Sequence, residues 1–381
     1  MSDGRRRRKA KQTRREERRR KKRNPEALAE PRIADPAPPT GVTWGPRDLL
    51  VLTSELIQAT RPDPFAWLRT GDRGEPPSLD ATVAGLIAQW VPNSTAVLAV
   101  LAELLVDDEN LRTRCRLEVA ARSHRLPRWI IELTHIEVYR AARITHVLGD
   151  GDELLIGVRL VDGHELTCAV FIDHNMLSEV KDAGLVSDST DNVLVELAER
   201  SNDPDTSIVE MSLADARAWI EQGLDQPVIT REIGSWPGVQ PLVRWLIGHL
   251  PEFGEPYRPP VWGYRPTLEL CAEFFASSQG AQFQDYEHQE LLLELLETGN
   301  GDPLRWSVAR IEQALGGSGP YDEHLSVGSV LDAPELLPEF VPFVHAKSGI
   351  RDELTAQALA VIDELGPGYR REVLARVEWS A

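Results

Sequence analysis

The sequence predicts a predominantly α-helical protein with a small α+β unit and a disordered basic arm at its N-terminus. Three observations lead to this fold class. Apolar residues recur at helical spacing over most of the chain after Trp44. Two Gly-Asp turns separate β-rich runs between Ile136 and Ile172, and the first 30 residues show no apolar periodicity. The expected sheet is a three-stranded antiparallel meander over roughly 138–148, 154–161 and 165–172.

The N-terminal arm carries a charge opposite to that of the rest of the chain. Residues 1–23 contain 14 basic and three acidic residues, or +11, whereas the 381-residue chain has a net charge of −18 and the remainder therefore carries −29. Residues 1–30 cannot bury enough apolar surface to offset the entropy of ordering, so we expect them to be disordered. The cations expected to bind a polyanion are Arg5, Arg6, Arg7, Arg8, Lys9, Lys11, Arg14, Arg15, Arg18, Arg19, Arg20, Lys21, Lys22 and Arg23.

Proline and turn residues divide the chain into segments. Four prolines between Pro31 and Gly41 predict a stiff spacer of polyproline type. Pro46 suits a first helical position, and Ser78 and Ser94 are typical helix N-caps. The expected organisation is an arm at 1–30, a spacer at 31–41, a helical unit at 42–126, an α+β unit at 127–250, a Pro- and aromatic-rich linker at 251–266 and a helical domain at 267–381.

The meander is expected to bury one face. Alternation places Leu154, Ile156, Val158 and Leu160 on one side of the second strand, and Leu166, Cys168, Val170 and Ile172 on one side of the third. Helices near 192–200 and after Ser212 are expected to cover that face. Further helices are expected at 267–277, 284–298, 303–315, 333–347, 353–364 and 368–377.

Composition and spacing exclude several classes of site. Three distant cysteines (Cys115, Cys168 and Cys271) do not form a disulfide framework and are expected to be core residues. No histidine pair has the spacing that places two imidazoles around a metal on one helix, so neither a metal nor a cofactor is expected. No apolar run is long enough to cross a membrane, and no signal peptide follows the basic run, so a cytoplasmic protein is expected.

One local cluster of acids and imidazole is a candidate for general acid–base catalysis. It consists of Asp173, His174 and Asp182, beside the end of the third predicted strand. Strand ends are rich in Asp, Asn and His for backbone reasons alone, and we favour that structural interpretation. Asp150 and Asp152 indicate a hairpin turn, because the residue order of a calcium-binding loop is missing.

Two segments carry a family resemblance. The first runs from Leu148-Gly-Asp-Gly-Asp through Gly163-His-Glu-Leu-Thr and Val170-Phe-Ile-Asp-His-Asn to Val180-Lys-Asp. The second combines Asp302-Pro-Leu-Arg-Trp-Ser307 with Phe340-Val-Pro-Phe-Val-His345, Gly349-Ile and Glu353-Leu-Thr355. Over about 140–380 the chain resembles a family of uncharacterised actinobacterial proteins. The resemblance implies a recurrent fold and carries no activity, cofactor or catalytic residue.

The leading hypothesis is a cytoplasmic, non-enzymatic interaction protein whose arm binds a polyanion, with RNA or the ribosome favoured. No aromatic residue interrupts the arm and no second basic patch follows it, so neither base stacking nor readout of a specific DNA site is expected. One alternative is an enzyme with its site near Asp173 and His174. Another is an adaptor that binds only protein, using the segment around Trp262 beside Pro259-Pro260. The arm could also contact its own acidic body or be an inert tail.

Overall fold

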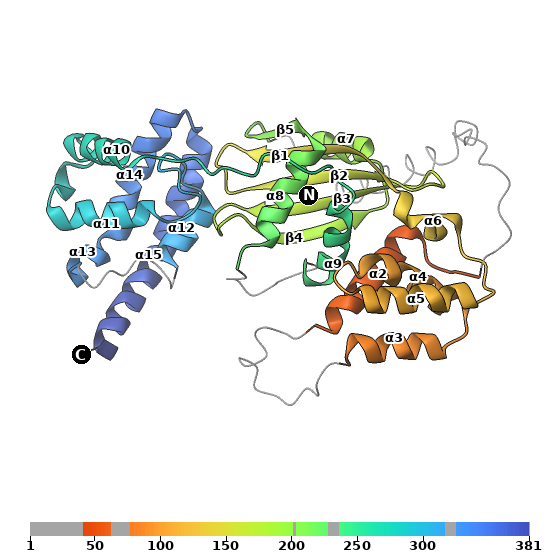
Figure 1. The fold of residues 1–381 in the computed structure, drawn as a ribbon. Coiled ribbons are helices and arrows are strands. Elements are labelled where there is room, and N and C mark those ends of the chain that lie inside the picture. The colour runs from red at the N-terminus through yellow and green to blue at the C-terminus, as the bar shows by residue number, and fades with distance from the viewer. Residues whose placement is uncertain (1–40, 62–76, 201–202, 228–235, 317–324, 381) are drawn as a thin grey trace, which may run out of the picture. The chain divides into compact units, whose positions relative to one another are not determined.

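The described structure begins after the arm. A computed structural model describes residues 41–61, 77–200, 203–227, 236–316 and 325–380 (Figure 1). The arm with its 14 cations and all of the spacer before Gly41 therefore lie outside the described residues. Helices predominate in the described part, as the sequence predicts. No helix there combines the length and the apolar character needed to cross a bilayer.

The sheet corrects the predicted fold class. It has five antiparallel strands in the order β4-β3-β2-β1-β5, so the prediction of a three-stranded meander is wrong. The predicted strands correspond to the first three, which shift by a few residues at their ends. The bounds are β1 Glu137–His146, β2 Gly151–Arg159, β3 Glu165–Asp173, β4 Glu179–Val186 and β5 Thr206–Met211.

The two missed strands lack the alternation that marked the others. In β4, Lys181 and Asp182 are adjacent and both exposed, which interrupts the period of two. The six residues of β5 are exposed or half-buried throughout, because β5 forms an edge of the sheet next to β1. A short edge strand buries little side-chain surface, and its sequence therefore carries a weak hydrophobic signal.

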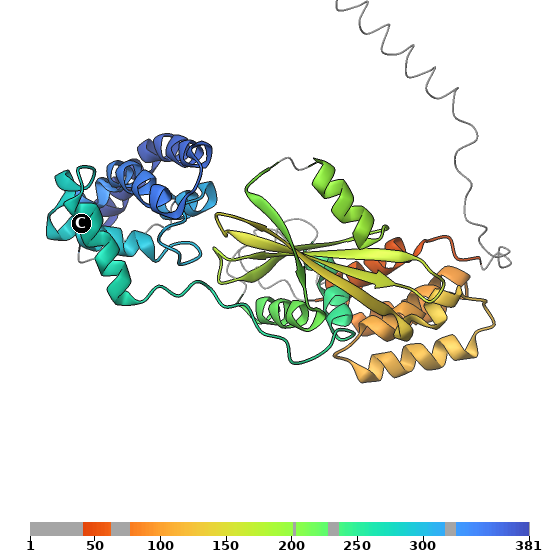
Figure 2. The same cartoon turned by 90° about the horizontal axis from the view of Figure 1, so that it is seen from above.

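Helices cover both faces of the sheet. One face packs into a large core that includes Leu154, Ile156 and Cys168, and α8 (Leu213–Leu224) lies on this side. The other face packs Ala142 and Leu155 against α7 (Thr190–Arg200). Figure 2 shows α7 and α8 on opposite sides of the strands. All three cysteines are buried, in agreement with the predicted core role.

The N-terminal helices share the larger core with the sheet. They contact β4 directly through the first described helix, whose Arg47 donates to the Leu185 carbonyl oxygen, and also through α9 (Trp236–Ile247), which packs along that helix. Arg122 is fully buried and closes the end of one helix by donating to the carbonyl oxygens of Leu86 and Ile87. These helices are α2 Pro46–Ala59, α3 Leu79–Ala88, α4 Pro92–Leu104, α5 Glu109–Ala121, α6 Arg128–Ile131 and the 3₁₀ helix η2 Leu133–His135.

The C-terminal helices build a second core around Phe274, Trp306 and Phe340. Gly349, with φ of +71° in the left-handed region, ends α14. Two predictions fail: Ser307 caps α12 instead of Asp302-Pro303 starting it, and one long helix, α15, replaces the predicted pair at 353–364 and 368–377. The bounds are α10 Tyr264–Ala276, η3 Ala281–Phe283, α11 Tyr286–Leu296, α12 Val308–Leu315, α13 Val327–Leu331, α14 Ala333–Ser348 and α15 Asp352–Ser380.

Polar contacts join the turn between β1 and β2 to the loop before α12. The side-chain amide of Asn300 donates to the carbonyl oxygens of Leu148 and Gly149 at 3.0 and 2.9 Å. Ser307 Oγ donates to Asp150 Oδ1 at 2.6 Å. The turn at 148–150 and the segment 300–307 therefore meet here, although they are about 150 residues apart in the sequence.

Candidate functional site

The turn between β3 and β4 has an unusual backbone. Glu179 N–H donates to the Met176 carbonyl oxygen at 3.0 Å, which closes a four-residue turn. Its two central residues, Leu177 and Ser178, have φ of +56° and +61°. Positive φ at both central positions is the pattern of a type I′ turn, which ordinarily holds Asn-Gly. A residue other than glycine in this region costs on the order of 1–3 kcal/mol, so the turn is strained at two positions.

His174 connects this turn to the second strand through both of its ring nitrogens. Nε2 lies 2.9 Å from Asp152 Oδ2, and Nδ1 lies 3.0 Å from Ser178 Oγ. All three residues are buried, with exposed fractions of 3% for Asp152, 6% for His174 and 8% for Ser178. Asp152, His174 and Ser178 form a continuous hydrogen-bonded chain, here called the relay.

The direction of the hydrogen bonds in the relay follows from the carboxylate. Ionised Asp152 can only accept, so His174 carries its proton on Nε2 and donates it to Asp152. The lone pair of Nδ1 is then free to accept, and the Ser178 hydroxyl donates to it. A carboxylate that fixes the tautomer, and a ring nitrogen that accepts from a hydroxyl, are the elements of nucleophile activation.

The surroundings of Asp152 favour its ionised form. Burial raises the pKa of Asp152, but the hydrogen bonds from His174 and Thr145 and the nearby charge of Arg143 lower it by more, so its pKa lies below the ordinary value. Arg143 Nη1 lies 3.5 Å from Asp152 Oδ2.

Aromatic rings hold the imidazole in place. Tyr257 stacks on His174 with ring centroids 3.8 Å apart and planes inclined by 8°, and Trp219 of α8 meets both rings edge-on. Arg143 lies over the face of Trp219 at 5.2 Å. Burial raises the pKa of Tyr257 to about 12, so its hydroxyl stays protonated. The two aromatic rings therefore fix the orientation of the His174 ring, and both of its nitrogens still form hydrogen bonds within the relay.

The sequence candidates occupy different places around this site. His174 lies in the relay, but both of its nitrogens bind residues other than Asp173 and Asp182. Asp173, at the end of β3, pairs with Lys181 and accepts the Asn175 N–H at 3.0 Å. Asp182 lies on β4 and accepts the Ala183 N–H at 2.9 Å. The predicted three-residue cluster is thus replaced by one that shares only His174.

Sequence reasoning missed Asp152 and Ser178, although each left a signal. Asp152 lies two residues before Leu154 and so on the same, apolar face of β2, where a charged side chain calls for a partner. Ser178 lies in a hairpin turn with neither Asn nor Gly. The missing Asn and Gly could be noticed only if a hairpin turn was expected there, and the sequence analysis did not predict β4, the second strand of that hairpin.

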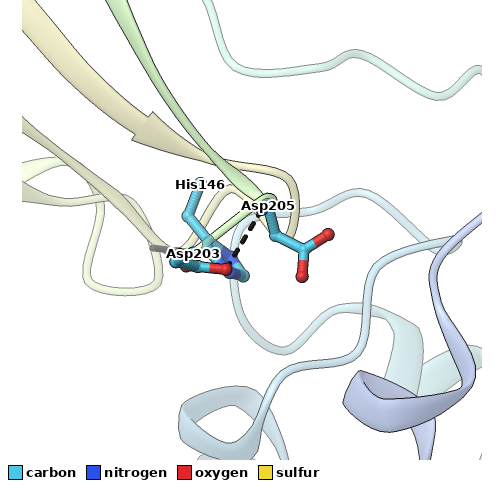
Figure 3. Close-up of side chains that lie close together, drawn as sticks. All are labelled: His146, Asp203 and Asp205. Atoms are coloured by element: carbon cyan, nitrogen blue, oxygen red, sulfur yellow. Dashed lines mark hydrogen bonds and ion pairs between the residues drawn. The ribbon is translucent and has the colours of Figure 1, made fainter. Parts of the chain in front are cut away.

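A second histidine lies with two carboxylates at the opposite end of β1 from α6. His146 ends β1, and Asp203 and Asp205 precede β5, so the pairing of β1 with β5 brings them together (Figure 3). One ligand atom from each lies within 4.8 Å of the others. The sequence analysis predicted no metal site here, because these residues are separated by more than 50 positions.

The bonding within this second cluster opposes metal binding. Leu148 N–H donates to His146 Nδ1 at 3.2 Å, so the neutral ring carries its proton on Nε2, the nitrogen that faces Asp203 at 3.7 Å. Arg351 Nε contacts both carboxylate oxygens of Asp205 at 3.0 Å, which already neutralises that group. We interpret the cluster as an ion-paired anchor for the start of β5.

No protein-family model, no curated protein and no solved structure matches the chain.

Proposed function

We propose that this protein is a cytoplasmic interaction protein that its N-terminal arm holds on a polyanion, with RNA or the ribosome favoured. The observation that carries the proposal is the separation of charge, with +11 in residues 1–23 and −29 in the remainder. Lysine use supports it, because four of the six lysines lie in those 23 residues while the remainder relies on arginine. An arm of this charge binds phosphates without regard to sequence.

The ion pairs of the described residues favour the arm over the body as the binding element. Most arginines and lysines there lie within 4 Å of a carboxylate, so their charge is compensated locally. Arg159, for example, meets both Glu137 and Glu165 at 2.8 Å. Other paired cations include Arg112, Arg114, Arg128, Arg217, Arg265, Arg305 and Arg351. An acidic body with paired cations repels a phosphate backbone, which leaves the arm to bind it.

The adaptor alternative loses its expected contact residue. Trp262 is half-buried and packs against the C-terminal core, so it is not the free docking residue that the sequence analysis expected. The most exposed aromatic side chain of the linker is instead Phe253, at 98%.

Salt dependence of RNA binding by the full-length chain tests the proposal. If the arm neutralises about five to eight phosphates of a single-stranded RNA, log K should fall with log salt at a slope of about −4 to −6. Replacing the six cations from Arg18 to Arg23 by glutamine should reduce the slope by roughly two, in proportion to the six of 14 cations that are lost, whereas replacing the four arginines among them by lysine should leave it nearly unchanged. Equal binding by the wild-type and glutamine variants would sink the proposal. So would the absence of RNA binding by the full-length chain at about 100 mM salt.

A second measurement separates RNA from a protein target. Full-length protein and the glutamine variant are each used to capture partners, with and without nuclease treatment. Capture that depends on the arm and disappears with nuclease supports RNA or the ribosome. Capture that depends on the arm and survives nuclease contradicts the RNA assignment and favours a protein target.

A further inference from the structure

The residues of the β3–β4 turn suit a chemical role better than a purely structural one. Asn-Gly would meet the backbone requirement of positive φ at both central positions without strain. Leu177 and Ser178 occupy these positions instead, and the Ser178 hydroxyl is the group that reaches His174 Nδ1. Strained residues that break a local rule cluster at functional sites. The feature that serine adds over glycine here is the hydroxyl.

The hydrogen bonds of the relay run in the direction that would activate the Ser178 hydroxyl as a nucleophile. Asp152 fixes the Nε2–H tautomer of His174, and Nδ1 accepts the hydroxyl proton. Tyr257 and Trp219 hold the ring so that Nδ1 faces the turn. We propose that Ser178 is a nucleophile that His174 and Asp152 activate for the hydrolysis of small carboxylic esters. This proposal is independent of the polyanion-binding arm.

The reaction needs only the ester and water. Ser178 Oγ forms a bond to the carbonyl carbon as its proton passes to His174 Nδ1. The bond from that carbon to the alkoxy oxygen then breaks, and the alcohol leaves with the proton from His174. Water attacks the acyl-serine in the same way, which releases the carboxylic acid and restores the hydroxyl. Asp152 remains ionised throughout and stabilises the imidazolium.

The surroundings of Ser178 limit the substrate. Ser178 is 92% buried, whereas its neighbour Leu177 is 58% exposed, so access is from the side of the turn. Helix α8 closes the opposite side, because a Cβ on Gly223 would lie 2.9 Å from the Ser178 carbonyl oxygen. We therefore expect small acyl groups to react and bulky ones to be excluded.

Covalent labelling of the full-length protein with a small fluorophosphonate tests the proposal. Ser178 Oγ displaces fluoride from phosphorus, and the adduct is located by mass spectrometry of peptides. The expected result is one adduct per chain, on Ser178. Ser178→Gly should remove it without unfolding the chain, since glycine favours the positive φ of this position. Ser187→Ala, at an exposed serine after β4, should label like the wild type.

Two further readouts separate activation from a structural role. His174→Gln should slow the labelling of Ser178 by about 100-fold or more, the usual effect of losing a general base. The wild type should also hydrolyse p-nitrophenyl acetate, and Ser178→Gly should not. The proposal is overturned if Ser178 of the wild type is not labelled, or if a folded His174→Gln variant, checked by circular dichroism, is labelled at the wild-type rate.

Discussion

Two histidine–aspartate pairs on the same sheet differ in the partner of the second ring nitrogen. His174 is buried, donates a hydrogen bond from Nε2–H to Asp152, and accepts a hydrogen bond from the Ser178 hydroxyl at Nδ1. His146 is half-buried, faces Asp203 with Nε2, and accepts the Leu148 N–H at Nδ1. A backbone amide cannot be deprotonated by imidazole at neutral pH, whereas a hydroxyl can be activated for attack. The atom on the far side of the ring thus decides whether the pair is structural or reactive.

A third histidine extends the comparison to a ring whose hydrogen-bond partners are a backbone N–H and a hydroxyl. His345 accepts the Trp306 N–H at Nε2 and hydrogen-bonds Thr355 through Nδ1. Burial lowers its pKa to about 4, below the ordinary value of 6.5. The folded state therefore prefers neutral His345. Its contribution to stability is complete above pH 6.5 and is lost as the pH falls towards 4.

The largest expected effect follows from this shift. Between pH 7 and pH 4 the wild type should lose about 3 kcal/mol of unfolding free energy through His345 alone. Carboxylates also titrate in this range, so the measurement compares the wild type with His345→Gln by urea unfolding at each pH. The difference between the two should shrink by about that amount as the pH falls. A difference that does not change with pH would contradict the assignment.

The next largest effect is a difference between Asp152 and Asp203 in the unfolding free energy that is lost when each is replaced by alanine. Asp152→Ala leaves the buried Nε2–H of His174 without an acceptor, and we expect a loss of about 2 kcal/mol. Asp203→Ala removes an exposed carboxylate and should cost less than about 1 kcal/mol. Denaturant unfolding at pH 7 measures both. Equal losses would remove the distinction between the buried and the exposed pair.

The smallest expected effect concerns metal at the second cluster. Zn²⁺ at His146, Asp203 and Asp205 would have to displace the Leu148 N–H and compete with Arg351. Zn²⁺ at about 100 μM should therefore leave the melting temperature of the wild type and of His146→Ala unchanged. A site with a Kd near 1 μM would instead stabilise the wild type by roughly 3 kcal/mol, and a shift that His146→Ala abolishes would show the interpretation wrong.

The sequence predicted the parts of this protein whose signal is local. The two Gly-Asp turns and the β-rich runs beside them identified β1 to β3, and alternation in the second and third placed residues such as Leu154 and Cys168 on the buried face. The edge strand β5 was missed because a strand paired on one side has little apolar surface to alternate. Two helices were expected at 353–364 and 368–377, but α15 runs through Pro367 without a break.

The candidate site was predicted only at its centre. His174 was identified from neighbouring acids in the sequence, but its partners are set by strand pairing. Asp152 lies 22 residues away and reaches the ring because β2 and β3 pair with Asp152 opposite Ile172. Register of this kind is a property of the whole sheet. A local window could not have supplied it.

The position of β5 has a consequence for the order of folding. Strands β1 to β4 follow one another as hairpins and can pair as soon as they are made, but β5 closes the far edge, and the residue before it, Asp205, is held by Arg351. These two residues are 146 positions apart. At about 5–20 residues per second, Arg351 is synthesised roughly 7–30 s after Asp205. Throughout that interval β5 can pair with β1 but lacks the anchor that Arg351 gives the turn before it, so this edge of the nascent sheet is more open to strand exchange than in the complete protein.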